Sequence, residues 1–448
     1  MSEIIKSQSR PRIPRRVLGA LITSLKSGVV PRSGAPYIAI GRAREIDALV
    51  GDMKTVSEGG SAMRFIIGRY GSGKSFLMQL MRGYAAEQGF VCMDADLSPE
   101  RRLYGSGGSG LATYRELIKN MSSKSSPDGN ALRSVVERQL SMARHAAASE
   151  GIDVCDPSYA ERVGQIVRGQ LRELCLSVGG FDFCEVLTRY LYSVMNGDDE
   201  TCSACLRWLR GEYSTKSEAK RTLGFSVSCI ADDDNWYDFI KLWAVYCRIC
   251  GYKGLVVMLD ECVNLYKITN RVSRENNYEK LLSMFNDTLS ARAEGLMMLL
   301  CGTPQFLEDT RRGLFGYEAL RSRLCDSRYA TPEYTSVSGP LIRLRRLSDD
   351  EMAALILRVK NLHAQYYGTS SELSMEDMAR FYNEQKKRAV SDDMITPREM
   401  IRDFLFVLDI MTEDPSITLD RVIGDAHGED KEDATRKRAA VTPEEIEL

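Results

Sequence analysis

The stretch FIIGRYGSGKSFLMQL, from Phe65 to Leu80, decides the fold of this chain. It opens on apolar residues of strand length, continues through glycines and closes with the apolar spacing of a helix. Residues Gly68 to Ser75 fit the pattern G-x-x-x-x-G-K-[S/T] at every defined position. Glycines let successive backbone N–H groups point at phosphate oxygens, and the helix that follows adds its positive end. The stretch therefore predicts a loop that holds a nucleoside triphosphate.

Two side chains of this loop have specific expected roles. Lys74 reaches the terminal phosphates, and the hydroxyl of Ser75 ligates Mg²⁺. The alternative is a glycine turn that matches the pattern by chance, which the strand before it and the helix after it disfavour. The residues expected to contact ATP are Gly68, Tyr70, Gly71, Ser72, Gly73, Lys74, Ser75 and Phe76.

A second motif, GLVVMLDE at 254–261, reads as a buried strand that ends in two carboxylates. A parallel strand next to the loop strand would bring Asp260 and Glu261 to the carboxyl edge of the sheet, where ligands bind. We expect Asp260 to hold the Ser75-bound Mg²⁺ through water, and Glu261 to orient and deprotonate the attacking water. The alternative is an Asp-Glu pair that only caps the strand.

A third strand-like run, LMMLLC at 296–301, is followed by Gly302, Thr303 and Pro304. A small polar side chain at a strand end beside the carboxylates can contact the γ-phosphate or the attacking water. We assign this role to Thr303, although a turn at a strand end favours the same residue types.

Strand-like and helix-like runs alternate around the loop, which predicts an α/β fold with a parallel sheet. Helical periodicity dominates a long middle region and again follows a further strand-like run at 339–348. The expected segments are a basic N-terminal arm and helix (1–35), the first part of the core with the phosphate loop (36–110), a helical insertion (111–251), the second part of the core (252–347), a helical lid (348–425) and a charged tail (426–448).

The composition is that of an ordinary globular protein: 448 residues, 44% hydrophobic, 27% charged and a formal net charge of −2. Such a balance gives no overall attraction to nucleic acid, so DNA binding would need a local basic surface. The candidates for such a surface more often form solvated faces. They are Arg10, Arg12, Arg15, Arg16, Arg343, Arg345 and Arg346.

The twelve cysteines have no regular spacing, and the sequence shows neither a secretory signal nor an apolar run long enough to span a bilayer. We therefore expect a cytoplasmic protein without membrane contact and with reduced thiols. CSAC at 202–205 and CRIC at 247–250 have the spacing of zinc ligands. Both lie in stretches with helical periodicity, however, and buried thiols are the preferred interpretation. No metal is assigned to them.

The order of these motifs resembles an AAA+ ATPase of the origin-recognition-like branch. The resemblance rests on IGRAREIDAL at 40–49, the phosphate loop, VVMLDE, the polar strand end, ALRSRL at 319–324 and TPREMIRDF at 396–404. It implies that Gly41 and Arg42 lie against adenine, and that Arg398 is a lid arginine that contacts the γ-phosphate of its own chain. It also implies that Arg323, or alternatively Arg321, is an arginine finger for a neighbouring subunit, and hence a homo-oligomer.

A narrower resemblance comes from the run LKSGVVPRSGAPYIAIGRAREIDAL at 25–49 together with DADLSPERRLYGSGGSG, LDECVNLYK and GTPQF. These runs are similar to the ATP-binding proteins of BREX-type phage-defence islands. The resemblance implies ATP and Mg²⁺ as cofactors and other defence-system proteins as partners.

The sequence is compatible with two functions. The first is an ATPase that uses hydrolysis to drive assembly or remodelling in a nucleic-acid-linked, anti-phage defence system. The second is a nucleotide-dependent switch or scaffold that recruits partners with little turnover. Glu261 favours the first, because a pure switch needs no general base, and the long helical middle favours the second. A P-loop kinase is disfavoured by the Asp-Glu pair and the distant lid arginine.

Overall fold

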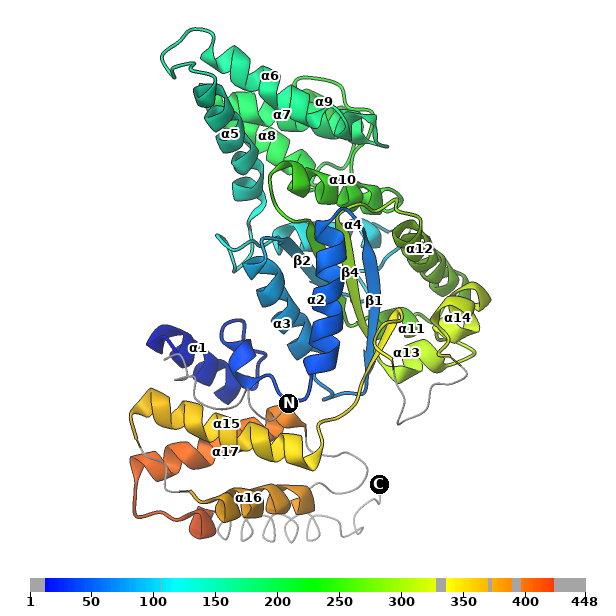
Figure 1. Ribbon diagram of the computed structural model, residues 1–448. Helices are drawn as coiled ribbons and strands as arrows, with labels where there is room; N and C mark the ends of the chain where they lie inside the picture. The colour runs from blue at the N-terminus through cyan, green and yellow to red at the C-terminus, as the bar shows by residue number, and fades with distance from the viewer. Residues whose placement is uncertain (1–12, 106, 328–335, 370–372, 389–395, 423–448) are drawn as a thin grey trace, which may run out of the picture. The chain divides into compact units, whose positions relative to one another are not determined.

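The computed structural model describes residues 13–105, 107–327, 336–369, 373–388 and 396–422 (Figure 1). Within these residues five strands form one sheet in the order β2-β3-β4-β1-β5, and every pairing is parallel. The strands are β1 (Ala62–Gly68), β2 (Val91–Asp96), β3 (Leu255–Asp260), β4 (Leu296–Gly302) and β5 (Leu341–Leu344). The predicted α/β fold with a parallel sheet is confirmed, including the strand predicted at 339–348.

The chain divides into two compact units, each discontinuous in sequence. One contains Ala43–Arg69 and Leu80–Arg345, and therefore the whole sheet; we call it the sheet unit. The other contains Met1–Arg42, Tyr70–Gln79 and Arg346–Leu448; we call it the helical unit. Most of the phosphate loop and the first residues of the helix after it, Tyr70–Gln79, therefore belong to the helical unit, although β1 leads directly into the loop.

Helices make up most of the remainder. Helix α3 (Lys74–Glu87) crosses the division between the units. The helical unit contains α1 (Arg15–Lys26), η1 (Ala35–Ile38), α15 (Asp349–Tyr367), α16 (Met375–Arg388) and α17 (Pro397–Glu413). The sheet unit contains α2 (Ala43–Ser57), α4 (Ser109–Lys119), α5 (Leu132–Ser149), α6 (Tyr159–Leu171), η2 (Leu174–Leu176), α7 (Gly180–Asn196), α8 (Asp199–Leu209), α9 (Lys216–Leu223), α10 (Trp236–Ile249), α11 (Val263–Tyr266), α12 (Arg271–Leu289), α13 (Pro304–Glu308), η3 (Leu314–Gly316) and α14 (Glu318–Leu324).

Both faces of the sheet are covered, as a parallel sheet requires. Successive side chains of β1 point to opposite faces. Phe65 and Ile67 belong to the core that continues into α4, α10 and α12, whereas Arg64 pairs with Asp52 of α2 on the other face (Nε to Oδ2, 2.6 Å). Figure 1 shows α2 lying along the strands. This double coverage explains why the strands read as unbroken apolar runs.

Helices α7, α8 and α10 share an aromatic core around Phe183. Its ring lies 5.0 Å from that of Trp243 and 6.1 Å from that of Tyr246, both edge to face. The two CxxC pairs lie in α8 and at the end of α10, where burial raises the pKa of Cys205 and of Cys250 to about 12. Among the described residues no group of three or more His, Cys, Asp or Glu side chains could hold a metal ion.

The helical unit is built around α1, α15, α16 and α17, whose apolar side chains form a second core that includes Phe381 and Phe404. The partly buried Phe76 of α3 packs against this core. Helices α15 and α17 both begin with a capping box, Ser348 with Glu351 and Thr396 with Glu399. No helix in the part of the chain that the structure describes is long and apolar enough to cross a membrane. The predicted tail at 426–448 lies outside the described residues.

Candidate functional site

The phosphate loop joins the end of β1 at Gly68 to the start of α3 at Lys74. Gly71 and Gly73 have φ values of 75° and 87°, a region that side chains with a Cβ rarely adopt. A Cβ on Gly71 would also lie 2.6 Å from Cγ2 of Thr396, so the loop backbone passes close to the first residues of α17. The loop therefore needs glycine both for its curl and for its packing.

The segment predicted to lie against adenine contacts the loop itself. Arg42 is 4% exposed, and its Nη2 donates a hydrogen bond of 2.8 Å to the backbone oxygen of Ser72. Arg42 thus holds the loop backbone and adds a positive charge behind it. The neighbouring Gly41 (φ 71°) lies against α15, where a Cβ would fall 2.4 Å from Oε1 of Glu351.

These features fit a bound phosphate chain. Helix α3 begins directly after the loop, so the positive end of its dipole lies at the loop. The Oγ of Ser72 is buried and has no hydrogen-bond partner among the described residues. Glycine curl, helix N-terminus and a buried hydroxyl together form a cradle for anionic oxygens.

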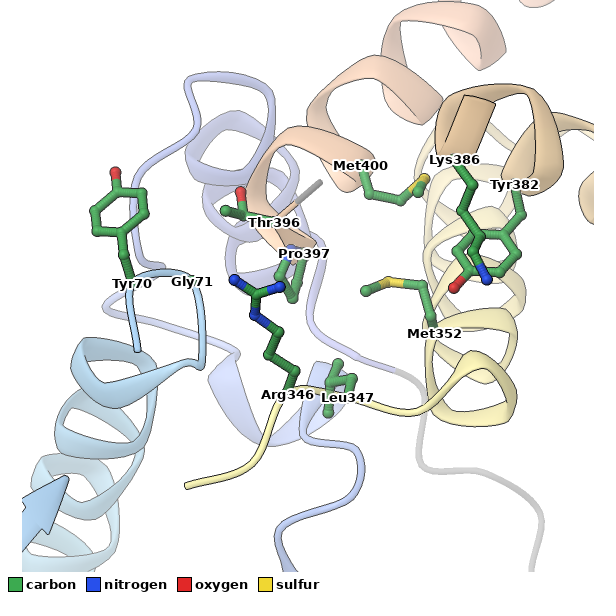
Figure 2. A pocket seen from close by; sticks show the side chains of 10 residues that line it. All are labelled: Tyr70, Gly71, Arg346, Leu347, Met352, Tyr382, Lys386, Thr396, Pro397 and Met400. Carbon is green, nitrogen blue, oxygen red and sulfur yellow. The ribbon is translucent and has the colours of Figure 1, made fainter. Parts of the chain in front are cut away.

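A pocket of the helical unit opens beside the loop (Figure 2). Figure 2 shows the guanidinium of Arg346 extending toward Thr396 and Pro397, next to the loop. The sequence indicated Arg346 only as a candidate for DNA contact. Its position beside the phosphate loop was not predicted, because no local sequence pattern indicates it. The lining residues are Tyr70, Gly71, Arg346, Leu347, Met352, Tyr382, Lys386, Thr396, Pro397 and Met400.

The acidic pair lies at the carboxyl edge of the sheet, but its strand is not the neighbour of the loop strand. The sequence led us to expect β3 beside β1, and that expectation was wrong: β4 lies between them, with Ile67 opposite Gly302 and Leu259 opposite Leu300. Two crossovers separate the loop strand from the acidic strand in the chain, and short motifs do not encode strand order. The three strand ends still lie at one edge.

Thr303 follows β4 and therefore stands between the end of β1 and the end of β3. Its Oγ1 accepts a hydrogen bond of 3.3 Å from the N–H of Phe306 and caps α13. The half-buried Thr303 hydroxyl still has its own hydrogen to donate. Thr303 therefore acts as the N-cap of α13, and its contact with the γ-phosphate or the attacking water stays a prediction.

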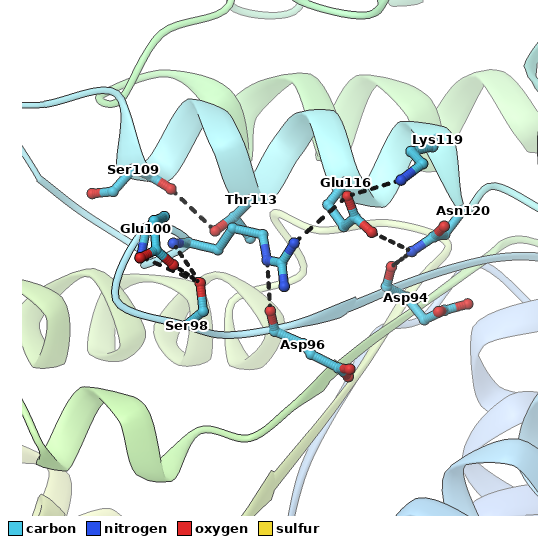
Figure 3. Close-up of polar contacts among 10 residues, drawn as sticks. Asp94, Asp96, Ser98, Glu100, Ser109, Thr113, Glu116, Lys119 and Asn120 are labelled. Carbon is cyan, nitrogen blue, oxygen red and sulfur yellow. Dashed lines mark hydrogen bonds and ion pairs between the residues drawn. The ribbon is translucent and has the colours of Figure 1, made fainter. Parts of the chain in front are cut away.

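Asp96, at the end of β2, is a further carboxylate that the sequence analysis did not select. It is the register partner of Asp260, and burial together with the charges of Asp260 and Asp94 raises the pKa of Asp96. Figure 3 shows the segment after β2 held against α4. Asn120 Nδ2 donates to the Asp94 backbone oxygen (2.9 Å), and Arg101 Nε donates to that of Asp96 (2.9 Å).

The three arginines implied by the AAA+ resemblance lie in different places. Arg398 is exposed at the start of α17, in the helical unit with the loop, and its Cγ lies 3.7 Å from the position of a Cβ on Gly28. Arg321 and Arg323 are exposed on α14 of the sheet unit. Arg323 donates to Oδ1 of Asn286 (3.1 Å) and to the backbone oxygen of Ala319 (2.7 Å).

The described basic residues that were considered for DNA contact belong to both units, Arg343 and Arg345 to the sheet unit and the others to the helical unit. Arg15 and Arg16 are exposed on α1, and Arg10 and Arg12 lie outside the described residues. Arg343 pairs with Glu308 (2.5 Å) and Asp326 (2.8 Å), which neutralise its charge locally.

The family comparison covers nearly the whole chain. Residues 13–427 match the model of a family described as BREX system ATP-binding protein BrxC/D. No curated protein matched the sequence. The resemblance to BREX ATP-binding proteins, inferred from the sequence, is confirmed by this match.

Proposed function

We propose, from the premise that this chain belongs to the BREX system ATP-binding protein family BrxC/D, that it binds ATP with Mg²⁺ and hydrolyses it as an AAA+ ATPase. The hydrolysis would drive assembly or remodelling within a phage-defence system whose other components are its partners. ATP binding and a place in phage defence follow from the family description. The hydrolysis, the metal and the AAA+ mechanism are our proposal.

One observation carries the proposal: the chain passes from β1 into the phosphate loop at the sheet edge where Thr303 and the Asp260–Glu261 pair end their own strands. In a parallel sheet this edge collects the ligands. A loop built only to hold a nucleotide would not need a general base such as Glu261 at the same edge.

Each residue then has a defined task. Lys74 and the loop N–H groups bind the phosphates, while Ser75 and Asp260 hold Mg²⁺, which neutralises charge on the phosphates. Glu261 is exposed at the edge, where it can orient water and accept its proton. Thr303 contacts the γ-phosphate or that water.

We also propose that the site is completed by two arginines. Arg398 belongs to the same unit as the loop and acts within its own chain. Arg323 is exposed on α14 and acts on a neighbouring subunit, which makes hydrolysis depend on homo-oligomer formation. Such fingers accelerate phosphoryl transfer by about 10³-fold or more.

A specific observation keeps the switch or scaffold as the second candidate. Residues 111–251, which we propose as an insertion, expose three large apolar side chains close together in sequence: Leu176 (86%), Val178 (81%) and Phe181 (70%). We propose residues 348–425 as the lid. In the second candidate ATP closes this lid, partners dock and turnover is incidental.

The substitution Glu261→Gln separates the two candidates. We expect the variant to bind ATP with an affinity close to that of the wild type and to hydrolyse it about 10²-fold more slowly or worse, because the general base is lost. The measurements are calorimetric titration with ATP and phosphate release at high protein concentration. Glu58→Gln, an exposed glutamate after α2, is the matched control. Turnover unchanged in Glu261→Gln would leave the switch as the better description.

A further inference from the structure

We infer that Asn264 is a positioning residue, which holds the backbone of Glu261 in the conformation that general-base catalysis requires. The inference rests on the proposed function, because it assigns a support to the residue proposed as the base. Asn264 lies in the four-residue helix α11, and the sequence analysis gave it no role, although the run LDECVNLYK contains it.

Glu261 has a backbone conformation that must be held in place. Its φ is 54°, and among the described non-glycine residues only Asn130 and Ala291 also have a positive φ. The left-handed region is unfavourable for an L-residue, because its Cβ comes too close to the following carbonyl oxygen. Such conformations persist where neighbouring contacts enforce them, and they concentrate at functional sites.

One side of this turn is held by β4. The N–H of Cys262 donates to the backbone oxygen of Cys301 (3.0 Å), and the Cys262 side chain is fully buried. The N–H of Glu261 donates to Oδ1 of Asp260 (2.7 Å). These contacts return the chain to the sheet directly after Glu261, and neither of them reaches the β2 side.

Asn264 supplies the support on the β2 side. Its N–H donates to the backbone oxygen of Glu261 (2.9 Å), and its Nδ2 donates to the backbone oxygen of Leu97 (2.8 Å). Leu97 in turn donates its N–H to the backbone oxygen of Asp260 (3.0 Å). The half-buried Asn264 therefore closes a ring of hydrogen bonds that joins Glu261, α11 and the end of β2.

The length of α11 explains why this one side chain matters. A single turn of helix is unstable by itself, because nucleation costs more than its few hydrogen bonds return. Without the side-chain bond to Leu97, α11 would lose its tie to the segment after β2, and only the backbone bond from Leu97 to Asp260 would remain on that side. A displacement of about 1 Å at a reacting group can reduce a rate by about 10²-fold.

The test is Asn264→Leu, which removes the amide at similar size. We expect kcat to fall about 10- to 100-fold while KM and the ATP affinity change less than about threefold, since only the base is misplaced. Asn120→Leu is the matched control. Its amide also donates to a β2 backbone oxygen, that of Asp94 at 2.9 Å, but it has no bond to Glu261. We expect the control to lose stability and to keep its kcat.

A double-mutant cycle separates positioning from a general structural effect. In single-turnover assays Asn264→Leu should slow the wild type but cause no further loss in the Glu261→Gln background. A full additional loss in that background, or an unchanged kcat in Asn264→Leu, would overturn the inference. If Asn264→Leu does not fold, Asn264→Asp, which keeps the size and loses the donor, replaces it in the same cycle. If Glu261→Gln itself turned over at the wild-type rate, the proposed function would fail first, so the two failures are distinct.

Discussion

At the scale of single residues, the site depends on positions where only one residue type fits. Gly71 and Gly41 both combine a positive φ with a close neighbour, Thr396 in one case and Glu351 in the other. Arg42 is equally constrained, because it must reach the Ser72 backbone while nearly buried. These residues shape the loop, whereas the proposed role of Lys74 is to supply charge to the ATP phosphates.

Lys74→Ala should reduce ATP affinity at least about 100-fold, because the phosphates lose a charge-assisted donor. Calorimetric titration with ATP measures this, and Lys54→Ala, an exposed lysine of α2, is the control. An affinity for ATP close to that of the wild type would remove the assignment of the phosphate loop.

Gly41→Ala should lower the free energy of unfolding by about 1–3 kcal/mol. The new Cβ costs energy at φ 71° and displaces the Glu351 carboxylate, which accepts the Ser348 N–H in the capping box of α15. Denaturant unfolding is the measurement, and Gly51→Ala, a glycine within α2 with open space around it, is the control. Equal stabilities of the two variants would contradict this packing.

At the scale of elements, the helical unit joins α1, α15 and α17 through one polar cluster. Asp409 of α17 accepts from Lys26 of α1 (2.8 Å), and its Oδ1 lies 3.0 Å from Nε2 of His363 in α15. Tyr367 packs against the His363 ring at 4.6 Å and accepts from Lys26. Burial lowers the pKa of His363 below 6.5, although Asp409 opposes this shift.

The stability of this unit should therefore fall at mildly acidic pH. Because the folded state has the lower His363 pKa, the unfolded state binds more protons below about pH 6.5. The stability is fully present above that pH and is lost as the pH falls toward the folded-state pKa. Thermal unfolding between pH 5 and 8 should show a steeper loss for the wild type than for His363→Gln, in which this group does not titrate. Parallel curves would exclude the contribution of His363.

At the scale of the whole molecule, the proposed mechanism requires more than one copy of the chain. Arg323 and Arg321 lie on the exposed surface of α14 in the sheet unit, while Arg398 belongs to the helical unit with the phosphate loop. A finger that serves a neighbouring site and a lid arginine that serves its own site respond differently when variants are mixed.

We expect ATP turnover per subunit to rise with protein concentration. Arg323→Ala subunits, whose phosphate loops are intact, should regain activity when mixed with Lys74→Ala subunits, whose fingers are intact. Arg398→Ala subunits should not regain activity, because their defect lies in the site that must hydrolyse ATP. Arg321→Ala in the same mixtures decides between the two candidate fingers. Turnover that is independent of concentration, without rescue of either finger variant, would contradict a finger acting between subunits.

The sequence by itself determined the local features. The strand–loop–helix around Gly68–Ser75, the acidic pair after a buried strand and the strand-like runs all depend on residues that are neighbours in the chain. Backbone propensity, glycine curl and apolar periodicity act over such short distances, so they can be read without the fold.

Only the tertiary structure decided the features that join distant segments. It placed β4 between β1 and β3, brought Arg42 to Ser72 and put Arg346 beside the loop. It also bound Asn264 to Leu97, and so enclosed Glu261 from both sides. Strand order and such bonds depend on which distant backbone groups pair and which apolar surfaces are buried together. These are properties of the whole packed chain, and no short stretch of residues contains them.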